Sequence, residues 1–144
     1  MEEFELLKHI YKDSEMAVFT LEELLDDLKE KDNKIKRRVE DILKRYEYFK
    51  EESSCRLEEE GQGLPKTGRV SKMGAGMGIK KEVKKDNSDS SIADMLIQGI
   101  SMGSIEMEKK IKDYKGEVEK DCLALAKEFL SFQEEAIKHL KEFL

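Results

Sequence analysis

Few side chains in this sequence are of the types that perform catalysis, and their spacing is the first guide to function. His9 and His139 each lie one helical turn from a carboxylate, the arrangement of a surface histidine that makes ordinary contacts along a helix. Cys55 and Cys122 are far apart, lack C-x-x-C spacing and lie within helical apolar patterns, so we expect buried, reduced thiols. No Ser/His/Asp or Cys/His arrangement is apparent. These patterns do not support an enzyme.

One carboxylate, Glu15, is placed differently from most others. It lies close to the apolar stripe of its predicted helix, next to Met16 and four residues after Tyr11. A carboxylate in such a position costs free energy unless it is paired, bound or hydrated. Two interpretations therefore remain open: a glutamate that reaches water at the edge of the stripe, and a ligand for something bound.

The segment 64–85 combines glycines with positive charge. Its GAGMGIKK run lacks the GxxxxGK[ST] spacing, a preceding strand and a later acidic residue on a second strand, so it does not predict a nucleotide site. A solvated basic face and a docking site for an anionic partner both explain the charge, and the lack of interleaved aromatics favours the first. The basic residues are Lys66, Arg69, Lys72, Lys80, Lys81, Lys84 and Lys85.

Apolar residues recur at three- and four-residue steps along four long stretches, a period that predicts helices. We expect long helices at about 4–29, 34–59, 89–114 and 117–143, and a short one at about 69–85 that its glycines weaken. The third stretch is apolar around most of its circumference, so other helices must surround it. Within it, Gly99 and Gly103 predict positions where a neighbouring helix approaches closely.

The last stretch has two apolar seams rather than one. The second seam repeats at seven-residue spacing and consists of Leu123, Leu130, Ile137 and Leu144. An apolar face this wide predicts either a helix in the middle of the bundle, with the short helix against its second face, or a homodimer contact through the second seam.

Composition narrows the class of protein. The 144 residues are 42% charged with a single proline, which is typical of long helices with charged outer faces, and we expect one all-α domain over 1–144. The net charge of −6 argues against nonspecific nucleic-acid binding. No apolar run approaches the roughly 20 residues of a membrane-spanning helix, and the N-terminus is acidic, so we expect a cytoplasmic protein without a membrane segment.

The order of the predicted helices is that of a four-helix bundle with one crossover connection between the second and third long helices. In this order the chain resembles the ferritin-like superfamily, specifically the small bacterial ferritin-like bundles of unknown function. The resemblance implies an up-and-down bundle with a short extra helix in the crossover. It is carried by DSEMA, RYEYFKEE, EEGQGLPKTG, MGAGMGIKKEVKK, IADMLIQGISMGSIEMEKKIKDY and FQEEAIKHL.

The resemblance also implies a dinuclear iron or manganese centre whose ligands come from all four long helices. The positions of this sequence that match such ligands are Glu15, Glu47, Glu51, Glu135 and His139. The set is incomplete because no histidine follows the second-helix glutamates at three residues, and Glu135 and His139 are four apart. Gln98 lies where a glutamate is expected.

Three functions follow from these patterns. The first is a non-enzymatic, cofactor-free interaction or stress-associated protein with an unidentified protein partner and a degenerate metal site. The second is a carboxylate-bridged iron or manganese binding protein or oxidase. The third is an adaptor that docks an anionic partner on the basic segment 66–85.

Overall fold

The computed structural model describes residues 4–66, 86–114 and 120–144. These residues form four α-helices and no strand: α1 (Glu5–Asp27), α2 (Lys36–Glu59), α4 (Asp89–Asp113) and α5 (Leu123–Leu140). Two 3-10 turns, η1 (Lys120–Cys122) and η2 (Lys141–Phe143), flank α5. For the described part of the chain, the predicted all-helical four-helix bundle is confirmed. None of its helices combines the length and apolar character needed to cross a membrane.

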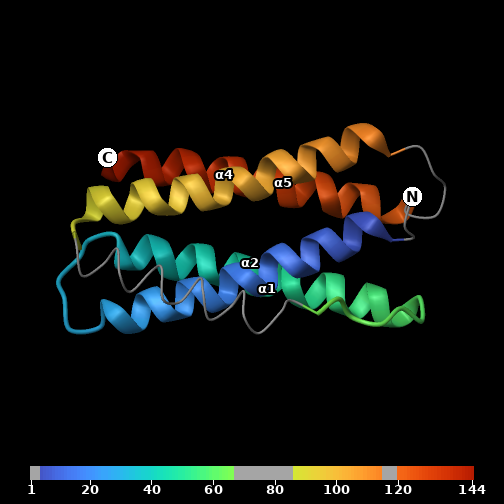
Figure 1. The fold of residues 1–144 in the computed structure, drawn as a ribbon, viewed down its shortest axis with the longest axis horizontal. Coiled ribbons are helices and arrows are strands. Elements are labelled where there is room, and N and C mark those ends of the chain that lie inside the picture. Colours follow the sequence, from blue (N-terminus) through green and yellow to red (C-terminus); the bar gives the residue numbers. More distant parts are fainter. Residues whose placement is uncertain (1–3, 67–85, 115–119) are drawn as a thin grey trace.

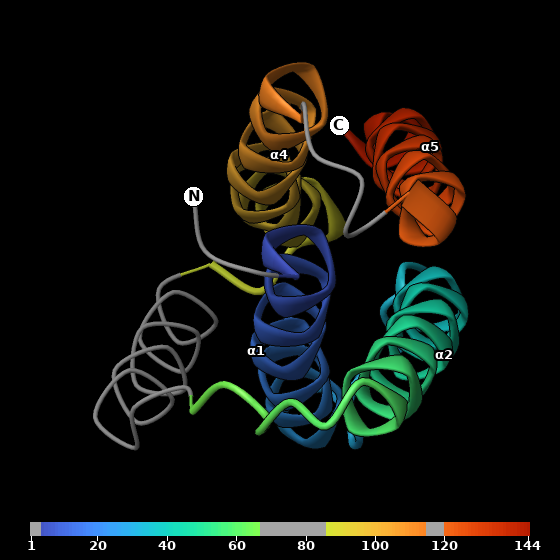
Figure 2. The same ribbon diagram turned by 90° about the vertical axis from the view of Figure 1, so that its right-hand side faces the viewer.

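The helices pair as two hairpins, α1 with α2 and α4 with α5, which lie side by side (Figure 1). The end view shows α1 beside α4 and α2 beside α5 (Figure 2). The chain reverses direction within each hairpin, and α2 and α4 run in the same direction along the bundle (Figure 1). The interior between the hairpins is therefore lined by all four helices.

The observed helix bounds agree with the predicted ones to within a few residues, except at the start of α5. The periodicity predicts a helix from about 117, whereas Lys120–Cys122 form a 3-10 turn and the α-helix begins at Leu123. Cys122, the residue before the helix, provides no capping hydrogen bond, and 3-10 turns are common at such helix ends. The predicted short helix at 69–85 and the turn after 114 lie outside the described residues.

Local hydrogen bonds close two of the helix ends. The Ser88 hydroxyl oxygen accepts from the Ser91 backbone N–H at 3.2 Å and so caps the first turn of α4. After α2, Gly61 has a φ of 69°, a left-handed conformation that glycine adopts without strain. That conformation lets the Gln62 backbone N–H donate to the Leu57 carbonyl at 2.9 Å.

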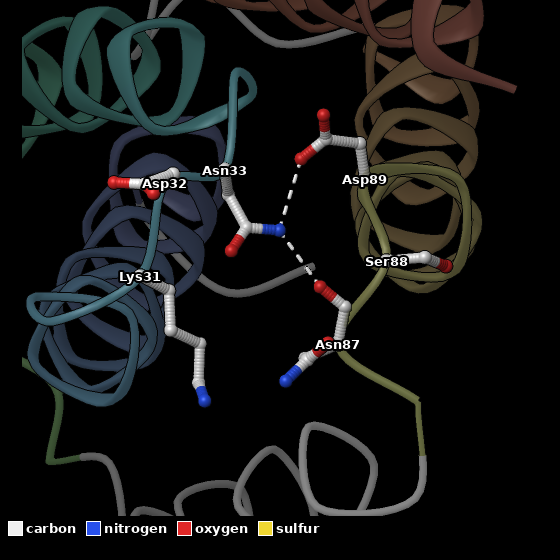
Figure 3. A pocket seen from close by; sticks show the side chains of 6 residues that line it. All are labelled: Lys31, Asp32, Asn33, Asn87, Ser88 and Asp89. Atoms are coloured by element: carbon white, nitrogen blue, oxygen red, sulfur yellow. Dashed lines mark hydrogen bonds between the residues drawn. The ribbon is translucent and has the colours of Figure 1, made fainter.

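The turn between α1 and α2 also holds the start of α4. Asn33 Nδ2 donates to the Asn87 backbone carbonyl at 2.7 Å and to Asp89 Oδ1 at 3.0 Å, across a surface hollow (Figure 3). The Ile35 backbone N–H approaches the same Asp89 oxygen at 3.4 Å. One side chain in the first hairpin therefore ties the first turn of the second hairpin to it.

Apolar side chains fill the space among the helices, and aromatic rings from α2 and α5 are the largest of them. Phe49 lies 5.0 Å from Phe129 and 5.5 Å from Phe132, measured between ring centroids. Tyr46 contacts Phe132 edge-on at 4.9 Å. Complete burial of such a side chain contributes roughly 1.5–3 kcal/mol. The further fully buried large side chains are Leu6, Leu7, Ile10, Leu24, Leu28, Ile35, Leu57, Ile92 and Met107.

Candidate functional site

A polar cluster lies inside the bundle where all four helices meet. Gln133 of α5 is fully buried, and its Nε2 donates to Asp13 Oδ2 of α1 at 2.8 Å and to the Tyr46 hydroxyl of α2 at 3.1 Å. Gly103 of α4 and His9 of α1 complete the cluster, which we call the polar node. A single amide group thus joins the second hairpin to both helices of the first.

Gly103 brings α4 against the carboxylate of Asp13. A Cβ atom at position 103 would lie 2.3 Å from Asp13 Oδ2 and 2.9 Å from Asp13 Cγ, closer than atoms of real side chains come. The predicted close approach at Gly103 is therefore confirmed. The same prediction for Gly99 is wrong, because Gly99 is exposed and a Cβ there would meet no atom within 4 Å.

Asp13 is the most strongly perturbed acid of the node. Burial raises the pKa of its carboxyl from 3.8 to about 6, while the hydrogen bond from Gln133 acts in the opposite direction. Burial also raises the pKa of the Tyr46 phenol, with a further contribution from the charge of Asp13. At neutral pH the node therefore contains a carboxylate and a neutral phenol that share one amide donor.

His9 faces the same carboxylate from one turn earlier on α1. Its Nε2 is 3.9 Å from Asp13 Oδ2, beyond hydrogen-bond distance, and its side chain is 12% exposed. Burial lowers the pKa of His9 below 6.5, as does the positive charge of Lys110, whereas a hydrogen bond with the Gly103 backbone raises it. Its interpretation as a surface histidine is wrong, and the ring is neutral at pH 7.

The node contains buried polar atoms without hydrogen-bond partners. Within the described residues these include Gln133 Oε1, His9 Nε2 and the hydroxyl oxygen of the neighbouring Ser14. A buried acceptor without a donor costs about 1–3 kcal/mol. Gln133 Oε1 is notable because a carboxylate has no hydrogen to donate to it, whereas a protonated carboxyl has one.

The residues of the predicted metal set belong to two groups, one near Tyr11 between α1 and α2 and one between α2 and α5. Glu47 and Glu51 are exposed on α2 and line a shallow cleft that also includes Tyr11 of α1. Glu15 is half-buried, and burial together with the hydrogen bond to Glu15 raises the pKa of the Tyr11 phenol. Among the residues that can be placed, no three His, Cys, Asp or Glu side chains are grouped so as to hold a metal ion.

The remaining metal candidates lie on the α2–α5 side. His139 Nε2 is 3.4 Å from Glu135 Oε1, the predicted contact along one helix face. Arg38 Nη1 of α2 lies 3.4 Å from His139 Nδ1, so this pair occupies a small cleft between the hairpins. Arginine nitrogens can only donate, so a hydrogen bond here uses the Nδ1 lone pair of His139, while its Nε2 faces Glu135.

Gln98 does not lie inside the bundle. It is exposed on α4, and its Nε2 donates to Asp94 Oδ2 at 3.2 Å. The interior amide is Gln133, which sequence reasoning missed. Two signals pointed to the node: Asp13 interrupts the apolar seam of the first helix, and Gln133 lies within the apolar seam of the last, four residues after Phe129.

The remaining predictions concern the second seam of α5, the two cysteines and the basic segment. Leu123, Leu130 and Ile137 of the second α5 seam pack partly against the core, and Leu144 is 61% exposed. Neither cysteine forms a disulfide within the described residues: Cys122 is buried as expected, whereas the prediction of burial for Cys55 is wrong because it is exposed. Lys66 is exposed, and the six other basic residues of the predicted docking segment, Arg69, Lys72, Lys80, Lys81, Lys84 and Lys85, lie outside the described residues.

No family model, curated protein or solved structure matches this chain. The ferritin-like resemblance therefore stays a prediction. Function has to be inferred from the chemistry of the polar node and of the molecular surface.

Proposed function

We propose that the protein is a non-enzymatic, acid-responsive helical bundle, a stress-associated interaction protein in which protonation of Asp13 tightens the docking of its two hairpins. The observation that carries this proposal is the Gln133 amide, which bridges Asp13 and Tyr46 across the hairpins and keeps a buried oxygen without a partner. A proton on Asp13 changes the charge and the hydrogen bonding at this junction together.

Protonation of Asp13 allows its carboxyl group to bond to both the Nε2 and the Oε1 atoms of Gln133. The carboxylate can only accept from Nε2, so at neutral pH Gln133 Oε1 has no donor, and the charge of Asp13 is partly buried. A protonated Asp13 keeps the hydrogen bond from Nε2 and donates its own O–H to Oε1. The resulting acid–amide pair removes a partly buried charge and satisfies a buried acceptor.

The raised pKa fixes the sign of the pH dependence. Asp13 binds a proton more tightly in the folded protein than in the unfolded chain, because its pKa is about 6 instead of 3.8. Its contribution to the free energy of unfolding therefore grows as the pH falls through 6 and is complete near pH 4. The difference corresponds to at most about 3 kcal/mol, since part of the side chain reaches solvent.

The other groups that face Asp13 modify this response in known directions. His9 has the opposite sign: its lowered pKa means that stability is lost as the pH falls below 6.5 and the buried ring gains a proton. Glu106 and Lys110 of α4 act on His9. Tyr46 from α2, Gln133 from α5 and Gly103 from α4 stay uncharged over this range. A His9→Gln background therefore isolates the response of Asp13.

Two measurements test the proposal directly. NMR titration of the Asp13 side-chain carbon should give a midpoint near pH 6 instead of near 4. Amide hydrogen exchange in the His9→Gln background, corrected for its intrinsic pH dependence, should show α5 better protected at pH 5 than at pH 7.5. A midpoint near 4, or protection of α5 that does not rise on acidification, contradicts the proposal.

The metal-binding and anionic-partner alternatives remain sequence predictions. The first depends on candidate ligands of which no three are grouped in the described residues, and the second on a segment of which only Lys66 is described. Elemental analysis of protein purified without a metal-affinity tag, followed by iron titration, tests the first. Neutralising Lys72, Lys80, Lys81 and Lys84 and measuring salt-dependent binding to heparin, a polyanion probe, tests the second.

A further inference from the structure

A small cleft of about 190 Å³ opens between α2 and α5, at the junction of the two hairpins. Most of its exposed lining is apolar and includes Ile42, Ala136 and the half-buried ring of Phe132. Ligand sites in proteins are usually concave and mostly apolar, with a few polar groups that orient the ligand. Drug-sized sites have roughly 300–1,000 Å³, so a ligand that fits this cleft is smaller.

Two arginines of α2, Arg38 and Arg45, line this cleft without acidic partners. Asp41 and Glu135 line it as well, but neither of them, nor any other carboxylate of the described residues, forms an ion pair with either arginine. Glu135 Oε1 is instead 3.4 Å from His139 Nε2. The charge of both guanidinium groups is therefore available to a ligand.

Arg38 carries a buried donor that nothing in the described residues satisfies. Its Nη1 lies 3.4 Å from His139 Nδ1, whereas its Nε is buried without a hydrogen-bond partner. A buried donor of a charged group is costly to leave unpaired. The contact of Nη1 with His139 leaves the edge formed by Nε and Nη2, whose two parallel N–H groups match the two oxygens of a carboxylate. An oxyanion is therefore the group that would complete the hydrogen bonding of Arg38.

The two ends of the cleft differ in character. Arg38 and His139 form one end, and Arg45 and Phe132 form the other, seven residues or about 10 Å away along each helix. At the second end the Arg45 guanidinium carbon is 5.5 Å from the centroid of the Phe132 ring, a cation–π contact that holds the side chain in place. The exposed Asp41 carboxylate, between the two arginines in sequence, opposes a second negative charge. These features favour a monoanion with an apolar body over a dianion.

We propose that this cleft binds a small organic monocarboxylate. The Arg38 guanidinium turns toward the cleft and donates to the carboxylate from Nε and Nη2, while Nη1 stays on His139. The apolar body of the ligand lies along the cleft toward Phe132. Because α2 and α5 belong to different hairpins, the bound ligand stabilises their docking. The cleft is separate from the polar node, so this site does not depend on the acid response of Asp13.

Titration of the isotope-labelled full chain with sodium benzoate, followed by NMR at pH 7.5 and constant ionic strength, tests the proposal. We expect saturable shifts of the Arg38 Nε–H signal and of the amides that line the cleft. Arg38→Gln should weaken benzoate binding by at least about tenfold, because it removes a charge-assisted pair of hydrogen bonds. Arg37→Gln is the matched control: it removes an exposed charge of α2 outside the cleft and should leave binding unchanged.

Two further probes and a conservative variant separate this site from nonspecific attraction. Benzyl alcohol, which has the same ring without the charge, and inorganic phosphate should each bind at least about tenfold more weakly than benzoate. Arg38→Lys keeps the charge but loses the paired donors, so it too should bind benzoate more weakly than the wild type. A titration without saturable shifts, or benzoate binding that both Arg38 variants leave unchanged, overturns the proposal. Phosphate that binds as tightly as benzoate overturns the assignment to an organic carboxylate.

Discussion

The protein contains the same hydrogen-bonded pair twice, a glutamine amide that donates to an aspartate, in two opposite surroundings. In the polar node, Gln133 donates to Asp13 at 2.8 Å and joins two hairpins. On the outer face of α4, Gln98 donates to Asp94 at 3.2 Å within one exposed helix. In water such a bond replaces an equivalent bond to solvent, whereas in the interior its loss leaves a buried group without a partner. Because of burial, the Gln133–Asp13 pair is expected to contribute more to the free energy of unfolding than the exposed Gln98–Asp94 pair.

The two glycines of α4 repeat this contrast. Gly103 contacts the Asp13 carboxylate, and Gly99, one turn earlier, opens to solvent. In both regions the usual distribution of side chains is reversed: polar groups lie inside the bundle at the node, and the apolar side chains of Met102 and Ile105 are exposed on α4. Local departures of this kind tend to mark functional sites. Matched substitutions in the two regions test this interpretation.

The largest contrast is expected from removing the two amides. Gln133→Leu leaves the Asp13 carboxylate and the Tyr46 hydroxyl without their buried donor, and should lower the free energy of unfolding by roughly 4 kcal/mol at pH 7. Gln98→Leu, its exposed counterpart, should change it by less than about 0.5 kcal/mol. Urea denaturation measures both, at a protein concentration where each is monomeric. Equal losses would show that the node contributes no more than a surface contact.

Replacing the two aspartates separates the effect of charge from that of hydrogen bonding. Asp13→Asn imitates the protonated carboxyl, because its amide can accept from Nε2 and donate to Oε1 of Gln133. It should stabilise the protein by at most about 3 kcal/mol at pH 7.5 and by almost nothing near pH 4. Asp94→Asn should show no such pH dependence. Urea denaturation from pH 4 to 8 checks both, and a gain from Asp13→Asn that is constant with pH contradicts the assignment.

Alanine at the two glycine positions is expected to change the stability by smaller amounts and in opposite directions. Gly103→Ala places a methyl group against Asp13 and should destabilise the protein by about 2 kcal/mol despite alanine's better helix propensity. Gly99→Ala has free space and should stabilise it by up to ~1 kcal/mol. Thermal unfolding of both variants at pH 7 measures the difference. A stabilising Gly103→Ala would show that Asp13 moves aside freely and that the node is loosely held.

The sequence was sufficient to predict the four helices because helix periodicity is a local property. Four long apolar periods with polar outer faces predict four packed helices, and four helices are observed in the described residues. The candidate site was harder to predict because periodicity identifies a helix face but not the partner that it meets. Gly99 and Gly103 look alike in sequence, and only the position of α1 distinguishes them. The resemblance likewise drew attention to Gln98, whereas the interior amide is Gln133.

The hydrogen bonds of Asn33 at the end of the bundle are intermediate between the Gln133–Asp13 and Gln98–Asp94 pairs. Asn33 donates to Asn87 and Asp89 across the hairpins, as Gln133 does in the node, but near the surface, as Gln98 does on α4. If burial sets the energy, Asn33→Ala should cost about 1 kcal/mol, between the two glutamine variants. If the connection between hairpins matters more, its cost should approach that of Gln133→Leu. Urea denaturation of Asn33→Ala and of the double variant with Gln133→Leu decides between them, since additive losses indicate independent ties.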